Sequence, residues 1–139
     1  MKVEYPFTEQ EGRYRPLIPL LYTNPKNGKS YIAEALIDTG SDLTIFPKFL
    51  INKVGLNVVE DSKTSIDGYG ITQAPVKFWN HNLDITILNT SNKPIKSFKD
   101  ITVGCTGLEN ASPLIGSNIF FNGLKMTLDY KKKIIILEF

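Results

Sequence analysis

Residues 35–47 read ALIDTGSDLTIFP, which places an acidic turn between two apolar runs. The first run predicts a strand that enters the core, so part of the Asp38 carboxylate at its end is expected to be buried. Burying a carboxylate is costly unless the group accepts hydrogen bonds or shifts its pKa. The next residues offer partners, because Thr39 and Ser41 carry hydroxyl groups and Gly40 lets backbone N–H groups approach closely. Asp38 is therefore the first candidate functional residue of the chain.

A second apolar element, Leu114-Ile115-Gly116, lies far downstream of the acidic turn. Ser117 directly after it can cap a short helix, which we predict to run through Phe121 and to end at Asn122-Gly123. The chain thus carries two short motifs, one acidic and one apolar, that are separated by a long β-rich stretch.

The remaining apolar runs predict strands, because they alternate or are rich in β-branched residues. A hairpin tip is predicted at Asp67-Gly68-Tyr69-Gly70, between strands at 64–66 and 71–72. Proline at the start favours one or two helical turns over residues 47–53. Further strands are predicted at 17–22, 30–37, 44–46, 76–79, 83–88, 101–105, 124–128 and 134–137. We therefore predict one all-β domain over residues 13–139, preceded by a tail over residues 1–12.

Composition excludes several classes of function. The chain has 139 residues and a net charge of only +2, so a single domain without a nucleic-acid-binding surface is expected. The longest basic run, Lys131-Lys132-Lys133, is interpreted as a solvated hairpin turn. No stretch reaches the length of apolar residues that a membrane span needs. The first residues lack the apolar segment of a signal peptide, so we expect a cytoplasmic protein without membrane partners.

One cysteine and one histidine limit the chemistry further. Cys105 lies in a predicted strand and is expected to be a buried structural thiol without an intrachain disulfide. His81 lies between two asparagines, a polar stretch that predicts a surface loop. Serine- or cysteine-based catalysis would have to use this one histidine, and no cluster of metal ligands surrounds it. We therefore expect no metal and no cofactor.

The order of these elements resembles the retropepsin-like aspartic peptidases. Asp38-Thr39-Gly40-Ser41 matches the catalytic loop of that family, and Leu114-Ile115-Gly116 matches its hydrophobic-hydrophobic-glycine element. The resemblance implies that the apolar pair lies against the catalytic loop, that the glycine admits a close backbone crossing, and that a short helix follows. Arg15-Pro16-Leu17 resembles the Arg-Pro-Leu segment that opens viral members. The resemblance covers residues 13–139 and implies a closed acid-protease barrel with a flap hairpin and one short helix after the Leu-Ile-Gly element.

The resemblance implies an aspartic endopeptidase that acts on polypeptide substrates as a homodimer. Two carboxylates share one proton. One acts as general base on a water molecule, and the other acts as general acid toward the carbonyl group of the peptide bond that is cut. The chain has one Asp-Thr-Gly motif, so the second aspartate must come from another copy across a two-fold axis. Asp38 is the implied catalytic residue, and the strand at 134–139 is implied to lie close to the dimer interface.

The residues after Asp38 are implied to support the catalytic loop. Thr39 resembles the family threonine whose hydroxyl bonds across the two-fold axis, and Gly40 offers its N–H to the carboxylate. Ser41 resembles the hydroxyl residue of pepsin-type sites. We expect its hydroxyl to donate to the charged carboxylate, which would lower the pKa of the pair and favour activity in mildly acidic solution.

The predicted hairpin resembles the flap that closes over the substrate and excludes water. Tyr69 either packs on the peptide or is an exposed turn aromatic, and both interpretations stay open. The residues implied to contact the substrate or to form the flap are Leu43, Ile66, Gly68, Tyr69, Gly70 and Ile71, which suggest apolar side chains at the cut.

One position departs from the viral pattern. Viral members carry an arginine that pairs with the acid two residues after the catalytic-loop glycine, and here that acid is Asp42 while Ser117 stands at the arginine position. Arg15 remains as a candidate partner for Asp42 across the dimer.

An alternative function is a catalytically silent module that dimerises or binds peptides, since a fold can persist after its catalytic activity is lost. An unrelated β domain with an aspartate in a turn is the third interpretation.

Overall fold

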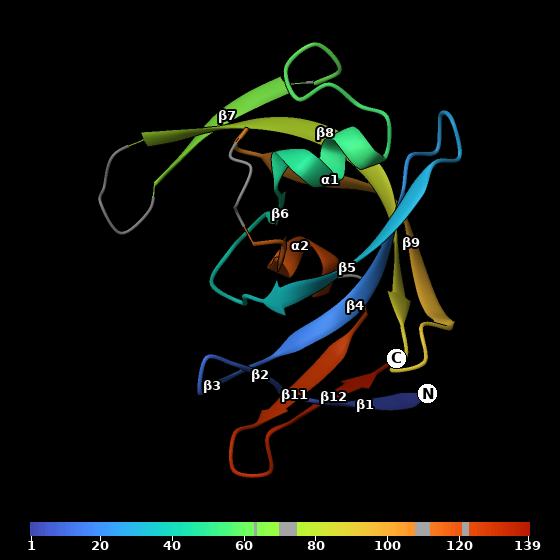
Figure 1. Cartoon of the computed structure of the whole chain (residues 1–139), viewed down its shortest axis with the longest axis vertical. Helices are drawn as coiled ribbons and strands as arrows, with labels where there is room; N and C mark the ends of the chain where they lie inside the picture. The colour runs from blue at the N-terminus through green and yellow to red at the C-terminus, as the bar shows by residue number, and fades with distance from the viewer. Residues whose placement is uncertain (63, 70–74, 108–111, 121–122) are drawn as a thin grey trace.

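The structure, a computed structural model, describes residues 1–62, 64–69, 75–107, 112–120 and 123–139. It is an all-β fold with two short helices (Figure 1). In chain order the elements are β1 Lys2–Pro6, β2 Thr8–Gln10, β3 Arg13–Arg15, β4 Leu17–Thr23, β5 Ser30–Ile37, β6 Thr44–Phe46, α1 Lys48–Lys53, β7 Thr64–Tyr69, β8 Pro75–Leu88, β9 Pro94–Cys105, β10 Leu114–Ile115, α2 Ser117–Phe120, β11 Lys125–Asp129 and β12 Ile134–Glu138. The predicted all-β class is confirmed.

The main sheet has the strand order β4-β5-β10-β6-β9-β8-β7. β4 also pairs with β8, in the register Leu20↔Ile87, so the order of pairings returns to its first strand. β7 lies outside this ring and, among the described strands, pairs with β8 alone. The two strands project from the upper left of the molecule in Figure 1. The sheet therefore has a curved body and one projecting hairpin.

Residues 1–12 were predicted to be a tail, but most of them are paired. β1 pairs antiparallel with β12, in the register Lys2↔Glu138, and β11 pairs with the other edge of β12. β2 and β3 form a small hairpin of their own. The strand β12 is thus the middle strand of a second sheet, and both chain ends lie together beside it (Figure 1).

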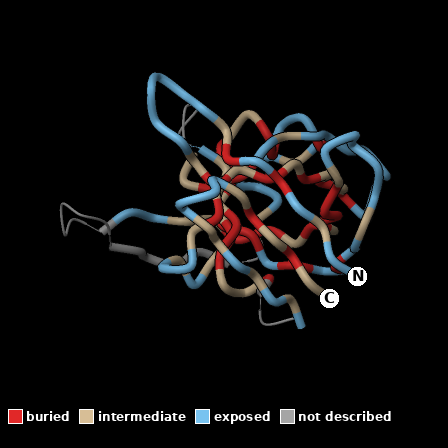
Figure 2. Tube along the Cα trace, turned by 90° about the horizontal axis from the view of Figure 1, so that it is seen from below, coloured by how far each residue is buried: buried red, intermediate tan, exposed pale blue. Residues whose placement is uncertain are grey.

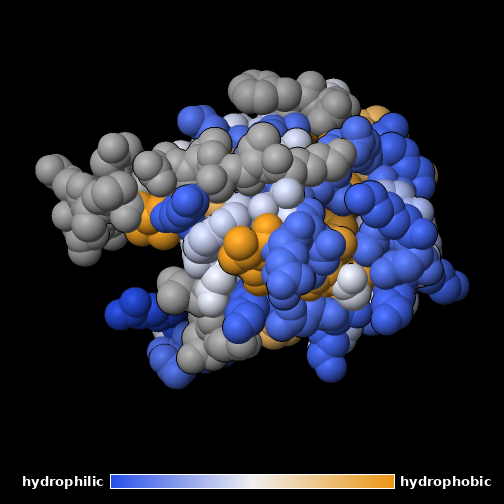
Figure 3. All heavy atoms as spheres, turned by 90° about the horizontal axis from the view of Figure 1, so that it is seen from above, coloured by the Kyte–Doolittle hydropathy of each residue, from blue (hydrophilic) through white to orange (hydrophobic). Residues whose placement is uncertain are grey.

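The core follows the predicted alternation along the strands. In β4 the side chains of Ile18, Leu20 and Tyr22 are buried, while those between them are half-buried. Figure 2 shows the buried stretches gathered inside the trace, and Figure 3 shows a largely hydrophilic face with hydrophobic atoms in small separate areas. Cys105 is buried at the end of β9, as predicted. No helix among the described residues is long and apolar enough to cross a membrane.

Two predicted loops are parts of strands. The polar stretch around His81 was predicted to be a surface loop, but β8 runs unbroken from Pro75 to Leu88 and the His81 side chain is only 1% exposed. Asp67, Gly68 and Tyr69 were predicted at a hairpin tip, but they lie in β7, where Asp67 pairs with Lys77. The connection between the two strands falls within residues 70–74, outside the described residues, and so does the predicted strand at 71–72.

Candidate active site

Asp38 directly follows β5 and begins a tight turn. Its backbone N–H donates to the carbonyl oxygen of Ile115 at 3.1 Å, which ties the turn to β10. The Gly40 N–H donates to Asp38 Oδ1 at 3.0 Å, as the sequence implied. The Ser41 N–H closes the turn by donating to the Asp38 carbonyl oxygen at 3.2 Å. The half-buried carboxylate is therefore oriented by a backbone donor of its own loop.

The two sequence motifs meet because β10 lies between β5 and β6. β10 runs parallel to β5, in the register Leu114↔Leu36, and antiparallel to β6, in the register Leu114↔Ile45. The acidic loop connects β5 to β6, so it must pass around the end of β10. The predicted association of the acidic loop with the Leu-Ile-Gly element is thus present in the structure.

Gly116 allows the chain to cross directly against the acidic loop. A Cβ atom at this position would lie 2.5 Å from the carbonyl oxygen of Leu43 and 2.9 Å from that of Ser41, and both are backbone atoms that cannot turn aside. The Ser117 N–H then donates to the same Ser41 carbonyl oxygen at 2.8 Å. Glycine is therefore required by a close backbone approach, as the family resemblance implied.

Thr44 joins three elements beneath the loop, a role that the sequence prediction missed. The side chain is fully buried; its Oγ1 accepts the Gly116 N–H at 3.1 Å and donates to Asn118 Oδ1 at 2.7 Å. Asn118 in turn donates from Nδ2 to the Thr102 carbonyl oxygen at 2.9 Å. A hydroxyl residue inside the apolar run that follows the acidic turn was the available clue, because a buried hydroxyl needs a partner.

The expected role of the Ser41 hydroxyl is not the one seen. Its Oγ donates to the Leu43 carbonyl oxygen at 2.6 Å and so holds the turn instead of the Asp38 carboxylate. A hydroxyl has a single proton to donate. The predicted hydrogen bond from Ser41 to the charged carboxylate is therefore wrong for this arrangement.

Leu43 of the acidic loop and Phe78 of β8 both lie close to Gly104 of β9. A Cβ atom at Gly104 would lie 2.5 Å from Leu43 Cδ2 and 3.4 Å from Phe78 Cβ, so the glycine gives the leucine room to lie on β9. Leu43 and Phe78 are both half-buried. Sequence reasoning named Leu43 for this region but missed Phe78, which faces the same glycine from the hairpin.

The other predicted flap residues are only partly placed. Ile66, Gly68 and Tyr69 lie in β7, opposite Phe78, Val76 and Pro75 of β8. The predicted residues Gly70 and Ile71 lie outside the described residues.

The remaining predicted residues of the catalytic loop and the dimer contact are Thr39, Asp42 and Arg15. Thr39 and Asp42 are exposed, and Arg15 is half-buried at the end of β3, where it borders an open groove together with Ser112. No ion pair joins Arg15 to Asp42 within the described chain. In the same part of the chain, no group of three histidine, cysteine, aspartate or glutamate side chains could hold a metal ion.

Comparisons with known proteins agree with this geometry at the level of the fold. No protein-family model matches the sequence, and no curated protein matches it. Among solved structures, a retropepsin-like aspartic protease from Rickettsia conorii matches with a TM-score of 0.62 and 19% sequence identity, over 99% of this chain and 91% of that chain. The chain therefore has the retropepsin-like fold.

Proposed function

We propose that this chain is an aspartic endopeptidase in which Asp38 is the catalytic residue. The observation that carries the proposal is that hydrogen bonds hold the loop around Asp38 in place. Asp38 directly follows β5, its Oδ1 accepts the Gly40 N–H, and its backbone N–H donates to the Ile115 carbonyl oxygen. A carboxylate that is held in place and still half-exposed can act on a water molecule as general acid or base.

The proposal includes a homodimer, because one carboxylate cannot serve as both base and acid. Two copies related by a two-fold axis would bring two Asp38 side chains together, in the arrangement by which aspartic proteases share one proton between two carboxylates. Peptide-bond hydrolysis then uses a water held between the pair, and a polypeptide is the substrate. The projecting β7–β8 hairpin is the proposed flap, and Phe78 of β8 and Leu43 of the acidic loop, which both lie close to Gly104, are proposed as apolar surface at its base.

The structure limits the way in which β12 can contribute to the expected interface. The resemblance implies that β12 lies close to the interface, and both of its edges are already paired, with β1 and with β11. A partner strand therefore cannot add to β12 unless one of these strands leaves. We propose instead that the loop around Asp38, with Arg15 of one copy near Asp42 of the other, forms the part of the interface nearest the two-fold axis.

The test is hydrolysis of an unstructured protein by the purified chain and by its Asp38→Asn variant at several pH values. Asparagine keeps the shape and removes the ionisable group from both copies at once. We expect turnover to fall by at least about 1,000-fold. The variant should keep its circular dichroism spectrum, because two buried acids that repel each other do not stabilise a dimer. Turnover in the Asp38→Asn variant would contradict the assignment of Asp38 as the catalytic residue. An inactive wild type that still binds peptides would favour the catalytically silent module.

A further inference from the structure

His81 is the single histidine of the chain, and it is buried beside the root of the proposed flap. It pairs with Val103 of β9 in the main sheet, and the preceding residue, Asn80, pairs with Thr64 at the start of β7. His81 Nε2 lies 2.9 Å from the carbonyl oxygen of Val58, in the segment that leads from α1 to β7. The ring therefore joins this segment to the strand that carries the hairpin.

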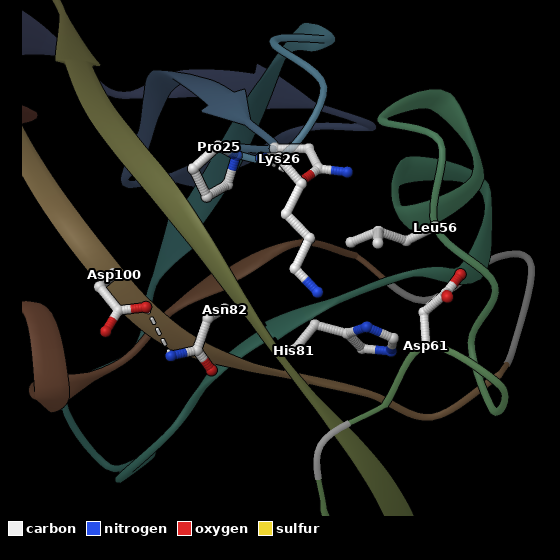
Figure 4. A pocket seen from close by; sticks show the side chains of 8 residues that line it. Pro25, Lys26, Leu56, Asp61, His81, Asn82 and Asp100 are labelled. Atoms are coloured by element: carbon white, nitrogen blue, oxygen red, sulfur yellow. Dashed lines mark hydrogen bonds between the residues drawn. The ribbon is translucent and has the colours of Figure 1, made fainter.

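The bond to Val58 decides which ring nitrogen carries the proton. A carbonyl oxygen only accepts, so Nε2 is the donor and Nδ1 of the neutral ring has a free lone pair. Nδ1 is buried and has no hydrogen-bond partner within the described chain. The ring borders a cavity of about 150 Å³, shown in Figure 4, whose other lining residues are Asn24, Pro25, Lys26, Leu56, Asp61, Asn82 and Asp100.

The segment held by His81 is a compact unit of residues 57–62. The Asn57 N–H donates to Asp61 Oδ2 at 2.6 Å, and Asn57 Oδ1 accepts the N–H groups of Val59 and Glu60 at 3.0 Å and 2.9 Å. The unit is therefore bonded mainly to itself, while Val58 contributes a buried side chain and the carbonyl oxygen that His81 binds. What His81 fixes is the position of this unit on the sheet.

Charged residues from three elements line the same cavity. Asp61 belongs to the held segment, Lys26 to the β4–β5 turn, and Asp100 to β9, where Asn82 already donates to its carboxylate. Figure 4 shows the imidazole between the Lys26 and Asp61 side chains. Of these charges, the Asp61 carboxylate favours the protonated ring.

The surroundings of the His81 ring favour its neutral form in the folded protein. Burial lowers the pKa of His81 below its ordinary value of 6.5, while the bond to Val58 and the Asp61 carboxylate raise it in part. Because the folded-state pKa is lowered, the stabilising contribution is present above the ordinary pKa and is lost as the pH falls through the lowered pKa. Acid therefore acts against the buried position of the ring, because a proton on Nδ1 would have no hydrogen-bond acceptor among the described residues.

We propose that His81 is a positioning residue whose neutral ring holds residues 57–62 against β8, and that protonation of the ring releases this segment and loosens the root of the β7–β8 hairpin. The contact itself follows from the geometry of this chain. Its effect on turnover rests on the proposed function, in which the hairpin is the flap.

The first experiment reads the ring directly, because a single histidine gives one unambiguous set of imidazole NMR signals. We expect the wild-type ring to titrate below the ordinary value of about 6.5, and Asp61→Asn to lower the titration point further by removing a favourable charge. Amide hydrogen exchange is followed in parallel. Protection of residues 57–62, corrected for the intrinsic exchange rate, should fall at least about ten-fold from pH 7.5 to below the titration point, while the β4–β5 ladder stays protected.

The matched control is His81→Gln, whose amide can still donate to the Val58 carbonyl oxygen but does not titrate. In this variant, protection of residues 57–62 should not change across the same pH range. A ring that titrates at the ordinary value, or a loss of protection that is the same in both proteins, would overturn the proposal. Neither readout requires turnover, so an inactive wild type would contradict the proposed function while leaving the contact at His81 to be judged separately.

Discussion

Two core tyrosines differ at the level of a single atom. The Tyr5 hydroxyl donates to the Leu88 carbonyl oxygen at 2.7 Å, whereas the Tyr22 hydroxyl is buried without a hydrogen-bond partner in the described part of the molecule. Burial raises the pKa of Tyr5 to about 12 and that of Tyr22 still further. Both hydroxyls are therefore fully protonated at any pH the protein meets, and only their hydrogen bonding separates them.

Replacing each tyrosine by phenylalanine should give opposite results. Tyr5→Phe removes a hydrogen bond and leaves a buried carbonyl group unpaired, so the free energy of unfolding should fall by about 1–3 kcal/mol. Tyr22→Phe removes a buried hydroxyl that binds nothing, so the free energy of unfolding should stay level or rise by about 1 kcal/mol. Urea unfolding of the three proteins measures both values. A loss of stability in Tyr22→Phe equal to that in Tyr5→Phe would show that the Tyr22 hydroxyl has a partner.

At the scale of elements, the acidic loop depends on the junction of β6, β10 and α2. Thr44 is the residue in which this junction meets, because one hydroxyl accepts from Gly116 and donates to Asn118. The junction should therefore be sensitive to the loss of this one oxygen atom.

Thr44→Val tests the junction with almost no change of shape. The variant leaves the Gly116 N–H and the Asn118 amide oxygen without the hydroxyl, so the free energy of unfolding should fall by about 2–4 kcal/mol. Thr44→Ser keeps the hydroxyl and loses one methyl group, so it should cost only about 1 kcal/mol. Chemical denaturation of both variants gives the comparison. Equal losses in the two would mean that packing, and not hydrogen bonding, holds the junction.

The elements that could be predicted are those whose structure is determined by residues that are close together in the sequence. The acidic turn, the Leu-Ile-Gly element and α2 are each specified by neighbouring residues, and the structure contains them. β1 was missed because its partner is β12, at the other end of the chain, and no local pattern encodes that pairing. His81 was predicted in a loop because its asparagine neighbours hide the alternation of β8. The His81 side chain is buried because the segment around Val58, which is not adjacent in sequence, packs against it.

The local contacts of the candidate site were predictable only in part. Gly40 and Gly116 make the contacts that the family resemblance implied, because backbone geometry leaves few alternatives. Ser41 has two acceptors within reach of a short turn, and the sequence does not show which one its hydroxyl chooses. Thr44 was overlooked because its two partners, Gly116 and Asn118, are far away in the sequence.

At the scale of the whole molecule, the proposed chemistry needs a second copy of the chain. If each active site uses one Asp38 from each copy, activity per chain must rise with protein concentration until the dimer is saturated. The dimer must form without a free edge of β12, because β1 and β11 occupy both edges. Assembly and activity should therefore change together.

Mixing wild type with Asp38→Asn separates a shared site from two independent ones. In saturated dimers that exchange subunits, an equal mixture should reduce the activity per wild-type chain to about half, because mixed dimers hold only one aspartate. The Lys131→Gln variant, whose exposed residue lies in the turn between β11 and β12, is a suitable mixing control for non-specific effects. Additive activity in the mixture, together with a monomer in sedimentation, would contradict the shared site.

The position of β10 between β5 and β6 also sets an order of events as the chain folds. The acidic loop is braced only when residues 114–118 arrive, and the bonds from Thr44 to Gly116 and Asn118 span 72 and 74 residues. Before residues this far apart along the chain can form a hydrogen bond, a long loop must close at a cost in conformational entropy. These contacts therefore form late in folding. A newly made or partly unfolded chain thus holds its aspartate on an unsupported turn, and competence for hydrolysis arrives only with the completed fold.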